Sequence, residues 1–197
     1  MQKKIILLSI CSVLVLSAQA QGFKGGLHLG LLATQVDGDN HAGYKKLGLF
    51  AGVFTNYSFL EKEIQLQFEL NYAQKGSANK TIYRMALQQV EPTVLLDWRF
   101  WEGFSLEAGL AFNILVSAKE YTNQVLIPKD VGSNFYLFNA DGIVGLKFQF
   151  REHWGTSLRF SYSTPIGRIN KSHSSVQRGV SGYIWNNCLL FRVYYQF

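Results

Sequence analysis

The stretch EIQLQFELNY, from Glu63 to Tyr72, alternates large apolar and polar residues without a break. Successive side chains on a β-strand point to opposite faces, so this segment predicts a strand with one apolar face and one polar face. In a soluble barrel or sandwich the apolar face would pack on a core. In a membrane barrel the apolar face would contact lipid and the polar face a lumen. The pattern therefore limits the chain to these two kinds of β protein.

The same alternation recurs in seven further segments, which predicts eight strands in the 197 residues. These segments are residues 23–33, 46–57, 87–100, 104–118, 135–150, 156–164 and 183–197. The connections alternate between short (58–63, 101–103, 151–155) and long (35–45, 74–84, 119–134, 165–182). An even number of strands with tight turns at one rim and long loops at the other is typical of outer-membrane barrels. The sequence thus predicts an all-β fold, an eight-stranded antiparallel up-and-down transmembrane β-barrel, with a bulge at Pro92, which cannot donate to a ladder.

The first twenty residues predict export. Lys3 and Lys4 precede an apolar run that ends at Ala18-Gln19-Ala20, the small-x-small pattern of a cleavage site. We expect residues 1–20 to be a signal peptide cleaved after Ala20, and residues 21–197 to form the barrel domain. The mature chain then keeps Cys188 as its only thiol, which excludes a disulfide within the chain. Its 17 bases and 13 acids leave a net charge of +4, too mild to indicate a nucleic-acid partner.

The predicted inner face carries five carboxylates and five bases. They are Lys24, Glu69, Glu91, Asp97, Arg99, Glu107, Asp141, Lys147, Arg159 and Arg192. Eight strands enclose a lumen that side chains can fill, and buried charges are tolerated when they pair with one another. We therefore expect these residues to form a lumen charge network that plugs the barrel. A small-solute channel is the alternative interpretation of the same row.

Aromatic residues gather near the predicted strand ends, as in the belts that flank a membrane. Near the short turns lie Tyr57, Phe59, Phe100, Trp101, Phe104, Phe150, Trp154, Tyr195 and Phe197; near the long loops lie Tyr72, Tyr83, Tyr162, Tyr183 and Trp185. The chain ends on Phe197 in an alternating strand, like the segment that barrel insertion machinery recognises. These features favour the outer membrane of a Gram-negative cell, with membrane lipids and the insertion machinery as contacts. A secreted soluble β-barrel remains the alternative.

The last long loop contains the candidate residues for an enzymatic or a binding site. His173 stands among serines in KSHSSVQ, and a Ser-His pair could activate a hydroxyl, as in an outer-membrane lipid-modifying enzyme. From Gly155 onward, however, the sequence contains no carboxylate to orient the histidine, so we expect no enzyme and no catalytic residue. The loop is also basic: Arg168, Lys171, His173 and Arg178 form a candidate partner-binding loop for lipopolysaccharide phosphates or an acidic surface.

Metal and cofactor sites are not predicted. His28, His41 and His153 are scattered over different segments without ligand-like spacing, and the sequence contains no phosphate-cradling glycine loop. We therefore expect neither a metal ion nor a cofactor.

Several segments resemble the outer-membrane β-barrel family typified by PorT, often labelled porin-like. These are GGLHLGLLAT, LGLFAGVFTNYSFLEKEIQLQFELNYAQKGS, FSLEAGLAFNILVSAK and the closing aromatic strand. The resemblance covers essentially the whole mature chain and rests on glycines, alternation and turn positions. This chain departs from the family at Glu91, where members commonly have an apolar residue. The resemblance implies a non-enzymatic binding or accessory barrel that supports protein secretion, with an outer-membrane or periplasmic protein as partner.

Overall fold

The computed structural model describes residues 22–37, 43–59, 63–79, 83–123, 125–126, 135–164, 169, 174–175, 180–181 and 184–197. The predicted signal peptide and all four residues of the candidate partner-binding loop, Arg168, Lys171, His173 and Arg178, lie outside the described residues. Among the described residues, no helix is long and apolar enough to cross a membrane.

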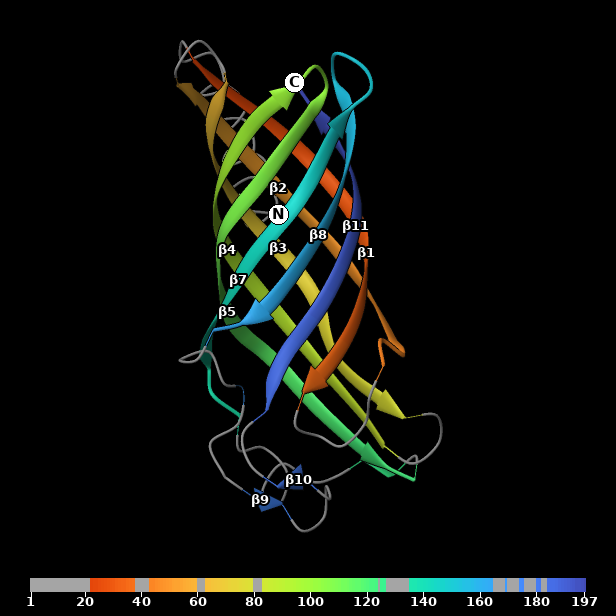
Figure 1. Ribbon diagram of the computed structural model, residues 1–197. Coiled ribbons are helices and arrows are strands. Elements are labelled where there is room, and N and C mark those ends of the chain that lie inside the picture. The colour runs from red at the N-terminus through yellow and green to blue at the C-terminus, as the bar shows by residue number, and fades with distance from the viewer. Residues whose placement is uncertain are drawn as a thin grey trace, which may run out of the picture.

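Eight long strands form one closed antiparallel barrel (Figure 1). They are β1 (Phe23–Asp37), β2 (Lys46–Phe59), β3 (Ile64–Asn79), β4 (Tyr83–Trp101), β5 (Phe104–Thr122), β7 (Phe138–Gln149), β8 (Trp154–Ser163) and β11 (Trp185–Gln196). The short strands β6 (Val125–Leu126), β9 (Ser174–Ser175) and β10 (Val180–Ser181) lie at the long-loop end. Each long strand pairs with its neighbours in sequence, and β1 pairs with β11 to close the ring. The predicted fold class is confirmed.

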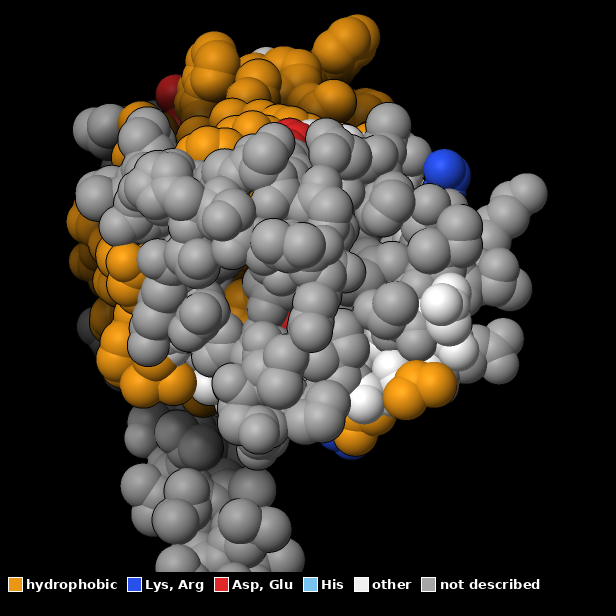
Figure 2. Space-filling view, turned by 90° about the horizontal axis from the view of Figure 1, so that it is seen from below, with side chains coloured by type: hydrophobic (Ala, Val, Ile, Leu, Met, Phe, Trp, Pro, Cys, Tyr) orange, Lys and Arg blue, Asp and Glu red, His pale blue; other side chains and the backbone are white. Residues whose placement is uncertain are grey.

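The two faces of each strand differ sharply in exposure. On β1, Leu29 is 65% exposed, whereas its neighbour His28 is 5% exposed. On β3, Phe68 and Leu70 are exposed while Glu69 is buried. Viewed from the long-loop end, hydrophobic side chains lie along the outside of the barrel, most visibly at the top and on the left of the picture (Figure 2). The apolar row of the alternating pattern therefore points outward, the arrangement of a barrel whose wall faces lipid.

The aromatic residues at the short-turn end form a band of neighbouring rings on the outside of the barrel. The centroids of Phe104 and Phe148 lie 4.5 Å apart, and those of Trp154 and Tyr195 lie 5.0 Å apart. Amphipathic and aromatic rings in such a band are favoured at a membrane interface. The band marks the height at which the short-turn end of the wall meets the headgroup region.

Several strands, β3 most of all, extend further than the sequence predicts. The segment 74–84, expected to be a long loop, is mostly paired, because the β3–β4 ladder continues up to Asn79 and Tyr83. Strands β3, β4 and β5 consequently project beyond the ring at the lower end of Figure 1. Polar residues such as Lys75 and Ser77, both 2% exposed, are compatible with a strand when its inner face is itself polar, and composition alone does not show this.

The prediction of a bulge at Pro92 is wrong. Between β4 and β5 the register is the same on both sides of the proline, with Val90 opposite Ile114 and Thr93 opposite Ala111. A register shift lies instead between Gln88 and Gln89. The ladder tolerates Pro92 without an inserted residue.

An apolar cluster fills the interior at the long-loop end. Its buried members are Val36, Met85, Leu87, Phe135, Ile169 and Ile184. Ile169 reaches this position through backbone hydrogen bonds, in which its N–H donates to the carbonyl of Ile184 and its own carbonyl accepts from Tyr136. The interior therefore contains an apolar cluster at this end, beside the buried Glu120 opposite Met85, and is strongly polar further along the barrel.

Candidate functional site: the charged barrel lumen

Two arginines and two glutamates from four strands meet at the centre of the lumen. Arg159 of β8 donates from Nε to Glu107 of β5 at 2.6 Å and from Nη2 to Glu69 of β3 at 2.7 Å. Arg192 of β11 donates to Glu69 at 2.8 Å and to Glu107 at 3.1 Å. All four side chains are buried. We call these four residues the central cluster; as ionised groups their charges sum to zero, which makes their burial tolerable.

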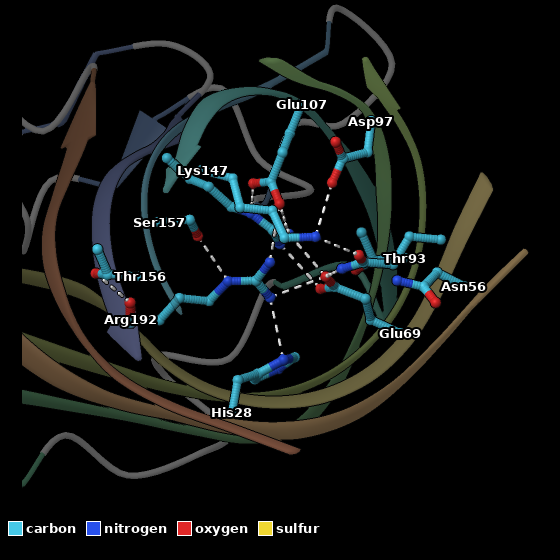
Figure 3. Close-up of polar contacts among 12 residues, drawn as sticks. His28, Asn56, Glu69, Thr93, Asp97, Glu107, Lys147, Thr156, Ser157 and Arg192 are labelled. Atoms are coloured by element: carbon cyan, nitrogen blue, oxygen red, sulfur yellow. Dashed lines mark hydrogen bonds and ion pairs between the residues drawn. The ribbon is translucent and has the colours of Figure 1, made fainter. Parts of the chain in front are cut away.

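Neutral side chains complete the hydrogen bonding of the central cluster (Figure 3). The amide nitrogen of Asn71 donates to Glu69 at 3.0 Å, so the amide oxygen of Asn71 accepts from Nε2 of His28 at 2.7 Å. Nδ1 of His28 is then free to accept from Nη1 of Arg192 at 3.1 Å. Nε of Arg192 donates to the hydroxyl of Ser157 at 2.8 Å. These partners assign His28 as a neutral positioning residue rather than a base beside a nucleophile.

A second ionic group lies further toward the long loops. Nζ of Lys75 on β3 contacts Asp141 of β7 at 2.7 Å and Glu91 of β4 at 2.8 Å. The hydroxyl of Ser163 donates to Asp141 at 2.9 Å. One cation thus holds two carboxylates, all of them buried. Because unpaired buried carboxylates are costly, Lys75 is the residue on which this group depends.

A third ionic pair lies on the short-turn side of the central cluster. Nζ of Lys147 on β7 donates to Asp97 of β4 at 2.7 Å and to Gln67 at 3.2 Å. The same ammonium lies 5.0 Å from the ring centroid of Tyr194, within the range of a cation–π contact. The pair forms the floor of a cavity at this end of the barrel.

That cavity, which we call the vestibule, has a volume of about 670 Å³. Its polar and charged lining includes Lys24, Gln65, Asp97, Arg99, Ser105, Lys147, Gln149, Arg151, Glu152, Tyr194 and Gln196. On the other side of the central cluster, a void lined by Lys75 and Arg159 measures only about 20 Å³, room for a single water molecule. The vestibule therefore ends before the central cluster, none of whose four residues lines it.

The structure brings eight of the ten predicted network residues into buried ionic contacts. These are Glu69, Glu91, Asp97, Glu107, Asp141, Lys147, Arg159 and Arg192. Lys24 and Arg99 instead line the vestibule with exposed side chains and form no ion pair with another described residue. Sequence reasoning missed Lys75 because it lies in the segment 74–84. The available signal was the two-residue period of β3, which places Lys75 on the same inner face as Asn71 and Ala73.

The lumen residues form ion pairs that join opposite sides of the barrel. Arg159 and Arg192 connect β8 and β11 to β3 and β5 across the barrel, so each guanidinium fixes two opposite parts of the wall. Among the described residues, His, Cys, Asp and Glu side chains do not assemble into a group that would hold a metal ion. Cys188, the free thiol, is buried among Leu32, Phe50 and Leu190.

A closed eight-stranded barrel with an apolar outer wall and a charged, filled interior is the architecture of small outer-membrane proteins. The model of the outer membrane protein beta-barrel domain family matches residues 18–164. The chain belongs to this family and is an outer-membrane β-barrel protein. Comparison with curated protein sequences finds no match.

Two solved structures show the same fold at low sequence identity. Ail, the attachment invasion locus protein of Yersinia pestis, solved with the heparin analogue sucrose octasulfate, is 12% identical with a TM-score of 0.52; the alignment covers 90% of this chain and 100% of Ail. Neisserial surface protein A is 10% identical with a TM-score of 0.52, over 90% of this chain and 98% of that protein. At such identity the likeness extends to the fold alone.

Proposed function

We propose that this protein is a non-enzymatic accessory barrel that binds other molecules at its two rims and conducts no solute. The observation that carries this proposal is the central cluster, in which Arg159 and Arg192 each contact both Glu69 and Glu107 across the lumen. A conducting barrel needs an open, hydrated path, and water-filled porins use about 16 to 18 strands. Because the middle of the barrel is filled, other molecules would bind at its two ends.

Support for protein secretion is the work that the resemblance to PorT-like proteins suggests. In this proposal the partner is another outer-membrane or periplasmic protein, and the basic loop with Arg168, Lys171, His173 and Arg178 contacts lipopolysaccharide phosphates or an acidic partner surface. A charged loop at the outer rim would act by electrostatic attraction and hydrogen bonding to anionic oxygens.

Crosslinking in cells followed by purification from outer membranes tests which rim binds a partner. Two triple variants carry the same change of charge at opposite ends: Arg168→Glu/Lys171→Glu/Arg178→Glu at the long-loop end, and Lys24→Glu/Arg99→Glu/Arg151→Glu at the short-turn end. We expect a specific protein to co-purify with the parent and to be lost from one triple variant. If the parent captures no specific partner, the accessory function is wrong.

Deletion of the gene tests the secretion role separately. We expect particular exported proteins to disappear from the medium or cell surface and to return on complementation, as measured by mass spectrometry. An unchanged set of exported proteins would contradict the role. For the enzyme alternative, His173→Ala is expected to leave the mass spectrum of lipid A unchanged, whereas a lost lipid A modification would show that the loop is catalytic.

A further inference from the structure

We propose that the vestibule at the short-turn end binds a small soluble anion that carries carboxylate or phosphate groups. This inference does not depend on the secretion role. It rests on the charge of the lining, on one buried hydroxyl without a partner, and on the shape of the cavity.

The lining of the vestibule has an excess of positive charge. It contains four cations, Lys24, Arg99, Lys147 and Arg151, and two carboxylates, Asp97 and Glu152. Lys147 and Asp97 already pair with each other at 2.7 Å. Lys24, Arg99 and Arg151 form no ion pair with another described residue. A concave site with low-dielectric walls concentrates the field of such charges and attracts anions.

Tyr194 lines the same cavity, and its hydroxyl lacks a hydrogen-bond partner. The residue is 2% exposed, and its hydroxyl oxygen is a buried atom with no partner among the described residues. A buried hydroxyl without a partner is unfavourable, so a ligand oxygen that reaches the hydroxyl of Tyr194 and accepts from it would recover this free energy.

Packing holds the Tyr194 side chain in one place. Its ring meets Phe54 edge-on at 6.0 Å and lies beneath the ammonium of Lys147 at 5.0 Å. The hydroxyl fits against Gly155, where a Cβ atom would lie only 2.1 Å away. The donor is therefore fixed before any ligand arrives, which lowers the entropic cost of binding.

The shape of the vestibule suits a held ligand rather than a passing one. A volume of about 670 Å³ falls within the range of about 300 to 1,000 Å³ typical of small-molecule sites. Asp97, Lys147 and Tyr194 form its floor, and the central cluster lies beyond them. Its mouth lies among the short turns, which face the periplasm in outer-membrane barrels, so the ligand arrives from water.

Calorimetric titration of the refolded barrel in uncharged detergent micelles at low ionic strength tests this proposal. The probes are citrate for carboxylates and pyrophosphate for phosphates, with sucrose as the neutral control. We expect saturable binding of at least one anion with one site per barrel, and none of sucrose. Arg99→Gln should weaken binding about tenfold, which corresponds to about 1.4 kcal/mol, because it removes a charged donor from the wall.

Two further variants locate the site. Arg84→Gln makes the same change of charge on an exposed residue of β4 near its long-loop end, and binding should change less than about twofold. Tyr194→Phe removes only the unpartnered hydroxyl, so the barrel should fold normally and bind the anion several-fold more weakly.

Three results would overturn the proposal. One is the absence of saturable binding of both anions to barrel that is shown to be folded by its heat-modifiable mobility in gels. Another is an equal loss of affinity in Arg84→Gln and Arg99→Gln, which would indicate general surface attraction. The third is unchanged affinity in Tyr194→Phe, which would place the anion outside the vestibule.

Discussion

Replacing Glu107 with glutamine removes one of the two negative charges that face Arg159 and Arg192 at the centre of the barrel. Glu107 accepts from Arg159 at 2.6 and 3.0 Å and from Arg192 at 3.1 Å. Glutamine has nearly the same shape but one acceptor oxygen, and its amide nitrogen would face guanidinium donors. The variant also leaves one buried positive charge without compensation. Breaking a buried pair in this way costs about 3–5 kcal/mol, which is the loss of stability that we expect.

The double variant Glu107→Gln/Arg192→Gln separates charge imbalance from altered shape. It restores a neutral cluster, because one arginine then faces the remaining Glu69. We expect its loss of stability to be smaller than the sum of the two single losses, by about 1–3 kcal/mol. The matched control is Glu152→Gln, an exposed residue at the short-turn rim, with an expected change within about 0.5 kcal/mol.

Urea unfolding of the barrel in phospholipid vesicles, followed by tryptophan fluorescence and gel mobility, measures these differences. The fitted slope should stay the same in all variants, so that a shift of midpoint reports stability. If Glu107→Gln unfolds within about 0.5 kcal/mol of the parent, the central cluster does not brace the lumen as argued. Strict additivity of the two single variants would contradict the coupling through shared contacts.

Three further predictions concern the wall, the lumen and the second ionic group. Leu158 lies four residues from Trp154 on β8, about 10 Å from the short-turn end of the wall and thus well inside the bilayer. Leu158→Arg should therefore lower stability in vesicles by about 2–4 kcal/mol. Leu47 lies about 30 Å from the same end, so Leu47→Arg should cost at most about 1 kcal/mol. Equal costs at both depths would refute the orientation of the wall. In planar bilayers the parent barrel should show no discrete openings, and a steady unitary conductance would disprove the plug. Lys75→Met should cost about 3–5 kcal/mol in urea unfolding by stranding two carboxylates, against about 0.5 kcal/mol or less for the exposed Lys45→Met; a small effect at Lys75 would mean that its carboxylates are not held as ions.

Much of the fold could be predicted because each strand alternates on its own. A strand with apolar residues at every second position and charges between them already contains its two faces. The position of the short turns was similarly local: Trp101–Phe104 and Arg151–Trp154 are polar or glycine-containing breaks between alternating runs. The eight-stranded topology followed from counting such runs.

The reach of β3, β4 and β5 beyond the ring could not be predicted in the same way. In this fold the inner face is polar, so residues such as Lys75 and Ser77 occupy a strand as well as a loop. Lys75 becomes a lumen residue only because β3 continues and brings its ammonium to Glu91 and Asp141, which come from two other strands. Local polarity does not distinguish these outcomes; pairing with neighbouring strands does.

The sequence by itself determined which residues share a face, because the two-residue period of a strand is a local property of the backbone. The sequence also determined that the inner face carries both carboxylates and basic side chains. Only the tertiary structure decided which charges meet, since the register of eight strands places Arg159 opposite Glu69 and Glu107 but leaves Arg99 in an open vestibule. Those distances depend on closure of the ring, where residues as far apart in sequence as His28 and Arg192, 164 positions, come into contact. Such contacts are set by the whole barrel rather than by any one strand.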